Sequence, residues 1–203
     1  MVGTVLLTGF EPFGGDARNP SGDAALALQG ELIADHRVHG LVLPCVFATA
    51  PAALAAAVQA TQPALVLCLG LAASRRGFHP ERVAINLIDA RIPDNAGAQP
   101  VDVPVQAGAA PAAFTTLPVK AMAAALQAAG HGATVSYSAG SYVCNQVFFA
   151  LMQLPVPHAG FLHLGGDLAL DEVIAGTRVA LAAALAVALV QGPDLMVSAG
   201  VVD

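Results

Sequence analysis

Residues 138–145 read SAGSYVCN, a run of small residues that leads into an apolar helical pattern. Ser141 is a suitable N-cap, which would make Cys144 roughly the third residue of that helix. The unpaired backbone N–H groups and the positive end of the helix dipole favour an anion there. Because the thiolate is the nucleophilic form of cysteine, the pattern predicts that Cys144 is a catalytic nucleophile. The rest of the chain must then supply a base, an orienting group and a pocket.

Strand and helix patterns alternate on both sides of this stretch. Apolar runs predict strands over residues 4–8, 38–46, 64–71, 83–88, 133–137 and 158–164. Helical signals predict helices over residues 20–29, 51–60 and 118–129, and a long last helix with Asp167 as its N-cap that extends to about Val190. This alternation indicates an α/β layer fold with a largely parallel sheet, in which ligands bind outside the carboxyl ends of the strands.

The composition bounds the architecture and the partners. No internal repeat or linker divides residues 1–203, so we expect a single domain. Hydrophobic residues make up 56% of the chain and charged residues 11%, which argues against disorder and favours oligomerisation that hides apolar surface. The formal net charge of -6 argues against nucleic acid and anionic membranes as partners.

Several kinds of segment are not expected in this chain. The most apolar run, residues 179–190, is shorter than the ~20 residues that a membrane-spanning helix needs. The amino terminus has no positive region before its apolar stretch, so we expect no signal peptide. Three cysteines without tight spacing do not form a disulfide framework, and we expect Cys45 and Cys68 to be small core residues. The expected compartment is the cytoplasm.

A base for Cys144 must come from the six histidines of the chain. Only His163 follows a buried apolar run and lies near the carboxyl end of a predicted strand, on the side expected for Cys144. Glu81 and Asp89 are the carboxylates best placed to orient the imidazole, and the sequence pattern leaves both open.

The loop at residues 9–16 reads GFEPFGGD, and neither helical nor strand packing explains Phe10 and Phe13. These rings either form a small satellite cluster or line an apolar recognition pocket. The two glycines do not indicate a phosphate cradle, because neither a GxGxxG nor a Walker pattern is present. Asn19 and Pro20 then read as the N-cap and the first residue of a helix.

A second unusual stretch begins with Glu81 and ends in a dense group of charges formed by Asp89, Arg91 and Asp94. In a chain so poor in charge, this group is either a structural ion-pair cluster or part of a functional site. Residues 95–116 follow as a long loop rich in Pro, Gly and Ala, and loops of that length in compact domains are often functional.

Four blocks of the sequence resemble pyroglutamyl peptidase I, also called pyrrolidone carboxyl peptidase. The blocks are TGFEPFGG at 8–15 with NPS at 19–21, ERVAIN at 81–86 with DARIPDN at 89–95, SAGSYVCN at 138–145, and GFLH at 160–163. Their common order and spacing extend the resemblance over nearly all of the chain.

The resemblance implies a cysteine peptidase that removes amino-terminal pyroglutamate from peptides through a thioester intermediate. In such an enzyme Cys144 would be the nucleophile, His163 its base and Glu81 the group that orients the imidazole. The resemblance further implies a three-layer α/β/α sandwich with a mixed, largely parallel sheet, a homotetramer, and no need for a metal or a cofactor.

The resemblance also implies which residues lie around the pyroglutamyl ring. They are Phe10, Phe13, Tyr142 and Val143 as enclosing residues, with Asn19 nearby and Arg91 beside the site.

One departure from the family concerns Leu71, which stands where the family has Gln after the glycine that ends the third strand. A residue at this place would lie near the ring, so a hydrogen-bonding group is lost. Two alternatives stay open: the same fold and triad acting on a different acyl or amide substrate, and a small-molecule binding homologue in which Cys144 is a buried helix residue.

Overall fold

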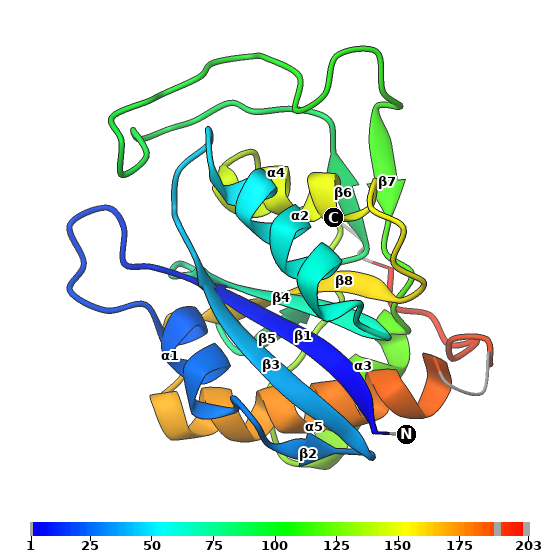
Figure 1. Cartoon of the computed structure of the whole chain (residues 1–203). Coiled ribbons are helices and arrows are strands. Elements are labelled where there is room, and N and C mark those ends of the chain that lie inside the picture. Colours follow the sequence, from blue (N-terminus) through cyan, green and yellow to red (C-terminus); the bar gives the residue numbers. More distant parts are fainter. Residues whose placement is uncertain (1, 189–191, 201–203) are drawn as a thin grey trace.

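A six-stranded sheet forms the centre of the protein, seen in the computed structural model, which describes residues 2–188 and 192–200 (Figure 1). The strand order is β2-β3-β1-β4-β8-β5. The four inner strands, β3 (His36–Leu43), β1 (Gly3–Phe10), β4 (Leu65–Ala72) and β8 (Ala159–Gly165), are parallel. The two edge strands, β2 (Leu32–Ile33) and β5 (Phe78–Pro80), are antiparallel to their neighbours. The predicted mixed, largely parallel sheet is therefore confirmed.

Helices cover both faces of this sheet. In Figure 1, α2 (Ala50–Thr61) and α4 (Val143–Leu151) lie above the sheet, and α1 (Pro20–Ala27), α3 (Val119–Ala128) and α5 (Leu170–Ala188) lie below it. The three layers confirm the predicted α/β/α sandwich. Within the described residues, no helix combines the length and the apolar character that crossing a membrane would require.

The sheet has two hydrophobic cores, one on each face, because successive residues of a strand point to opposite sides. On β1, Val5 and Leu7 pack in the core below the sheet, whereas Leu6 and Phe10 pack in the core above it. Both faces are covered, which explains why the inner strands read as continuous apolar runs rather than as alternating patterns.

The first helix begins as its sequence predicts. Asn19 is the N-cap of α1, and its side-chain oxygen accepts a hydrogen bond from the backbone N–H of Ser21 at 3.1 Å. Pro20 occupies the first helical position, where its missing N–H leaves no hydrogen bond unmade.

Two predicted N-caps are wrong. The N-cap position of α4 is Tyr142, so Cys144 is the second helical residue, and the Ser141 hydroxyl instead donates to the carbonyl of Asp89 at 2.8 Å. α5 begins at Leu170, and the carboxylate of Asp167 accepts from the backbone N–H of Gly77 at 2.9 Å. In both cases the polar side chain forms a hydrogen bond with a residue distant in sequence instead of capping the helix to which the local sequence pattern assigned it.

The segments between β4 and α3 differ most from prediction. The predicted strand over residues 83–88 is only β6 (Val83–Ile85), and it pairs with β7 (Ala112–Phe114) from the stretch predicted as a loop. Residues 133–137 form isolated bridges rather than a strand.

The predicted end of the last helix can be compared only in part. α5 extends to Ala188, and residues 189 and 190 lie outside the described residues.

The side-chain amide of Asn145 joins α4 to the segment that contains β6. Its oxygen accepts from the N–H of Ile85 at 3.0 Å, and its nitrogen donates to the carbonyls of Ile85 and Leu87 at 2.9 and 3.0 Å. Asn145 is fully buried, so water cannot replace these bonds. The amide therefore fixes the start of α4 beside the chain that follows Glu81.

We expect Asn145→Ala to lower the free energy of unfolding by about 3 kcal/mol, because each buried polar group left without a partner costs about 1–3 kcal/mol. Denaturation by urea, followed by circular dichroism, measures this change. Gln59→Ala, at an exposed position of α2, is the matched control and should stay within about 0.5 kcal/mol. Equal stability of the two variants would contradict the anchoring role of Asn145.

Candidate active site

A buried histidine and a buried carboxylate meet at the edge of the sheet. His163 lies near the carboxyl end of β8, and Glu81 follows directly after β5, the antiparallel neighbour of β8. The imidazole Nδ1 and Glu81 Oε1 are 2.7 Å apart, and the two residues are 4% and 0% exposed. Because a carboxylate only accepts, Nδ1–H donates this bond and Nε2 is left as a free acceptor. Of the two carboxylates that the sequence left open, Glu81 is the one bonded to His163.

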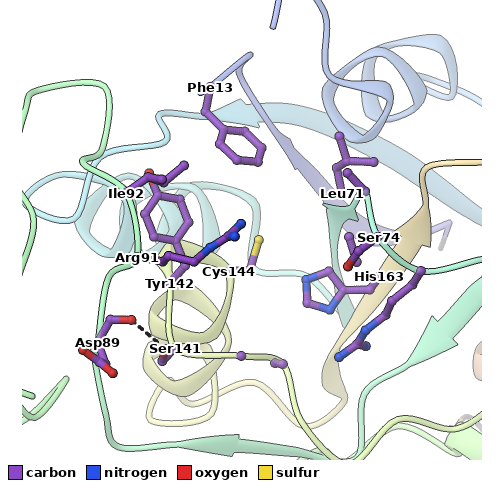
Figure 2. Close-up of a pocket in the computed structure, with 15 residues that line it drawn as sticks. Phe13, Leu71, Ser74, Asp89, Arg91, Ile92, Ser141, Tyr142, Cys144 and His163 are labelled. Carbon is purple, nitrogen blue, oxygen red and sulfur yellow. Dashed lines mark hydrogen bonds between the residues drawn. The ribbon is translucent and has the colours of Figure 1, made fainter. Parts of the chain in front are cut away.

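The thiol of Cys144 lies over the strand next to His163. Gly70 on β4 is the register partner of His163, and a Cβ atom placed on Gly70 would lie 2.9 Å from Cys144 Sγ. The same atom would lie 2.7 Å from Cζ of Phe161, which packs against the imidazole with ring centroids 4.8 Å apart. Figure 2 shows the sulfur and the imidazole on the floor of one cavity. The missing side chain of Gly70 makes room for the thiol there.

The environment of Cys144 does not by itself produce a thiolate. Burial raises the pKa of the Cys144 thiol, and the negative charges of nearby groups, including Glu81, act in the same direction. A backbone hydrogen bond at the helix start lowers this pKa but does not outweigh burial. The helix start therefore favours the thiolate, as expected, but burial outweighs this effect, and deprotonation needs the neighbouring base that the sequence also requires.

The other two cysteines are free and buried, as predicted. Burial raises the pKa of Cys45 to about 11 and that of Cys68 to about 12.

The cavity above the thiol has a volume of about 540 Å³. Its apolar wall includes Phe13, Ile92 and Tyr142, and Figure 2 shows the Phe13 ring pointing into the space above Cys144. The rings of Phe13 and Tyr142 are 6.0 Å apart, and the Tyr142 hydroxyl donates to the carbonyl of Pro93 at 3.0 Å. These contacts hold the aromatic wall in place.

The residues expected around a ligand divide into two groups. Phe13, Leu71, Arg91 and Tyr142 line the cavity, whereas Phe10, Asn19 and Val143 do not. Phe10 and Val143 are 2% and 0% exposed and belong to the core above the sheet. The side chain of Asn19 caps α1 and donates to the carbonyl of Glu11. Phe10 and Val143 are therefore core residues, and Asn19 fixes the start of α1.

Of the two alternatives for Asp89, Arg91 and Asp94, the structural ion-pair cluster is not formed. In residues 2–188 and 192–200 there is no ion pair among these three side chains. Burial alone would raise the pKa of Asp94, but backbone N–H groups that bond to its carboxylate lower it, and the second effect prevails. Asp94 thus shapes the local turn, while Asp89 and Arg91 line the cavity as separate charges.

Sequence reasoning missed two residues of the site, Gly70 and Arg75. Arg75 donates to Glu81 Oε1 at 2.9 Å and also lines the cavity. Its position shortly after a buried strand, in a chain with only eight Lys and Arg residues, was a usable signal. For Gly70 the only signal was a glycine near the end of a predicted strand.

Comparisons with known proteins agree with this geometry. A family model described as pyroglutamyl peptidase matches residues 3–186. The pyrrolidone-carboxylate peptidase of Chromobacterium violaceum is 47% identical over 190 residues, covering 88% of this chain and 90% of the relative.

Two solved structures are also similar to the protein. The pyrrolidone carboxyl peptidase from Thermococcus litoralis has a TM-score of 0.94 at 34% identity, covering 97% of this chain and 99% of that one. The pyroglutamyl peptidase I from Bacillus amyloliquefaciens has a TM-score of 0.92 at 36% identity, covering 98% and 100%. The chain belongs to the pyroglutamyl peptidase family.

Proposed function

We propose that this protein removes amino-terminal pyroglutamate from peptides, with Cys144 as nucleophile, His163 as base and Glu81 as the residue that orients the imidazole. The observation that carries the proposal is the buried Glu81–His163 hydrogen bond beside a thiol on the floor of a largely apolar cavity. Membership of the pyroglutamyl peptidase family supports the choice of substrate.

The reaction begins with transfer of the Cys144 proton to His163 Nε2, which the Glu81 hydrogen bond leaves free to accept. The sulfur attacks the carbonyl carbon of pyroglutamate and forms a tetrahedral oxyanion. Collapse of this intermediate breaks the amide bond, and His163 returns the proton to the leaving amine. Water then hydrolyses the thioester, with His163 again as base.

The oxyanion needs hydrogen-bond donors that are already in place. The backbone N–H groups at the start of α4 have no partners within the helix and lie beside Cys144. Arg91, whose side chain reaches toward the cavity in Figure 2, is a second source of donors. Donors aimed at the developing charge lower the barrier most.

The cavity suits a neutral lactam. Pyroglutamate has no charged amino group, so Phe13 and Tyr142 can enclose its ring without burying an ion. A five-membered ring fills only part of about 540 Å³, which leaves space for the next residue of the peptide.

Leu71 is the observation that favours a second candidate function. Its apolar side chain lines the cavity at the position where the family resemblance implies the side-chain amide of Gln. The same triad could therefore act on a different acyl or amide substrate. A purely ligand-binding homologue is less well supported, because it gives the buried Glu81–His163 pair no purpose.

The assembly and the domain boundaries belong to this proposal. One peptidase domain over residues 1–203 agrees with one central six-stranded sheet that is covered by helices on both faces. A homotetramer would cover exposed apolar side chains such as Val101 and Phe114, which are 62% and 66% exposed. The cytoplasmic location stays a prediction.

Cys144→Ala should abolish release of a chromogenic amine from a pyroglutamyl amide, because no other thiol lies in the cavity. We expect kcat/KM to fall by at least about 10³-fold. Cys68→Ala, at a core position outside the cavity, should keep most of the activity. Equal slow release by the native protein and Cys144→Ala would refute the peptidase assignment.

Alkylation by iodoacetamide tests the same nucleophile without a substrate. Cys144 should react before Cys45 and Cys68 when labelling at neutral pH is followed by peptide mass spectrometry, because Cys144 lines the cavity with His163 whereas the other two thiols are buried outside it. His163→Ala should slow labelling of Cys144 because the thiol then lacks its base. Equally slow labelling of all three thiols would argue for the binding homologue.

Gly70→Ala should lower kcat/KM by roughly 10- to 100-fold, because the new Cβ would displace the sulfur or the Phe161 ring. Steady-state kinetics with the same amide measures the change. Gly132→Ala is the matched control, since its Cβ would meet no atom closer than 4.0 Å. If both variants kept native activity, the thiol would not depend on the space over Gly70.

Leu71→Gln should lower KM for the pyroglutamyl amide by about 3- to 10-fold, the value of one added hydrogen bond to the lactam. Leu71→Met keeps an apolar side chain of similar volume and should leave KM unchanged. An unchanged KM in Leu71→Gln would mean that ring recognition does not use this position.

A further inference from the structure

Arg75 lies in the connection between β4 and β5, where its guanidinium bonds to three residues in two other segments. Nη1 donates to Glu81 Oε1 at 2.9 Å and to Ser136 Oγ at 3.0 Å, and Nη2 donates to the carbonyl of Ser138 at 2.7 Å. The side chain is 33% exposed, whereas the Glu81 side chain that it contacts is fully buried. One cation thus reaches from the cavity wall to a carboxylate that water does not reach.

The hydrogen bonds of Glu81 are unevenly divided between its two oxygens. Oε1 accepts from both Arg75 and His163, and Oε2 is buried without a hydrogen-bond partner in the described part of the chain. A buried charge is stable only when it is paired. While the imidazole is neutral, Arg75 is the only cation paired with Glu81 among residues 2–188 and 192–200.

Arg75 also forms hydrogen bonds with the segment that precedes Cys144 in the sequence. Ser136 and Ser138 precede Cys144 in the small-residue loop, and Ser136 Oγ also accepts from the Ser138 N–H. Because one guanidinium bonds this loop and Glu81 together, it sets the loop's position relative to the carboxylate that orients His163.

We propose that Arg75 is a positioning residue, which pairs with the buried carboxylate of Glu81 and holds the Glu81–His163 pair in a fixed position relative to the loop before Cys144. The inference rests on the peptidase function proposed above. Arg75 need not touch the reacting atoms, since it acts through Glu81 and through the loop.

The charge of Arg75 also has a definite effect on protonation. The titratable groups facing Glu81 are His163, Arg75, His79 and Cys144. A neighbouring cation favours the charged form of a carboxylate, and Arg75→Met removes the cation that pairs with Glu81. A protonated Glu81 would donate to His163 Nδ1, which places the imidazole proton on Nε2 and removes the base. The low-pH limb of the activity profile would then move to higher pH.

His79 does not replace the missing charge. Burial and the charge of Arg75 lower the pKa of His79, and its ring nitrogen Nε2 is 3.0 Å from the carbonyl of Arg76. Arg76 itself pairs with Asp167 at 3.4 Å, and its side chain is 88% exposed. The neighbouring arginine is therefore a matched control that carries the same charge outside the site.

The test compares Arg75→Met, Arg75→Lys and Arg76→Met in the full chain, with kcat and KM measured across pH on a pyroglutamyl amide. Arg75→Met should lower kcat by roughly 10- to 100-fold with KM within about 3-fold, and move the low-pH limb upward by about one unit. Arg75→Lys should keep the native limb and recover part of kcat, because it restores the charge but not the fork of donors. Arg76→Met should match the native protein.

Alkylation of Cys144 by iodoacetamide, measured across pH without substrate, separates this inference from the peptidase assignment. Its low-pH limb should move upward in Arg75→Met whatever the substrate, and adding Arg75→Met to Glu81→Gln should move this limb little further. Thermal melting identifies any variant that fails to fold. If Arg75→Met does not fold, the comparison of Arg75→Lys with Arg76→Met replaces it. An unmoved limb in a folded Arg75→Met protein, or equal effects of Arg75→Met and Arg76→Met, would overturn the inference. If the amide is not cleaved by the native protein but the alkylation limb moves, the peptidase function fails and the role of Arg75 stands.

Discussion

The rest of the site depends on the burial of one carboxylate charge. Glu81 is fully inside the protein, where an unpaired ion would cost several kcal/mol. Arg75 and His163 both bond its Oε1, so the pairing of this charge also fixes the plane and the tautomer of the imidazole. The two partners come from the connection after β4 and from β8, and the charge therefore holds these segments in one arrangement.

The sheet makes this arrangement possible. β5 is antiparallel to β8, and the Glu81 N–H donates to the Phe161 carbonyl at 2.9 Å, so the carboxylate is carried to the level of His163. β4 is parallel to β8, which places Gly70 directly beside His163. Because adjacent strands lie about 4.8 Å apart, a residue without a side chain next to the histidine leaves space for a thiol from α4.

The layer fold and several residues of the site could be predicted from the sequence, and the predictions that failed did so for physical reasons. The inner strands are buried on both faces, so their apolar runs identified the layer fold, and short signals such as Asn19 before Pro20 placed a helix start. The N-caps assigned to Ser141 and Asp167 failed because each side chain bonds to a partner distant in sequence, Asp89 and Gly77. The choice between Glu81 and Asp89 was open for the same reason, since a three-dimensional pairing decides it. Phe10 and Val143 were assigned to the pocket by resemblance, but the face of the sheet or helix on which a residue lies decides whether it reaches the cavity.

The apolar character of the cavity and the reactivity of the thiol are linked. The burial that suits a neutral lactam also raises the pKa of Cys144, so the thiol stays protonated unless a base takes its proton. His163 serves as that base while Nδ1–H donates to Glu81, because this hydrogen bond leaves Nε2 free to accept the proton. The nucleophile is therefore coupled through two hydrogen bonds to Arg75, more than sixty residues away in sequence, rather than to the helix start on which it lies.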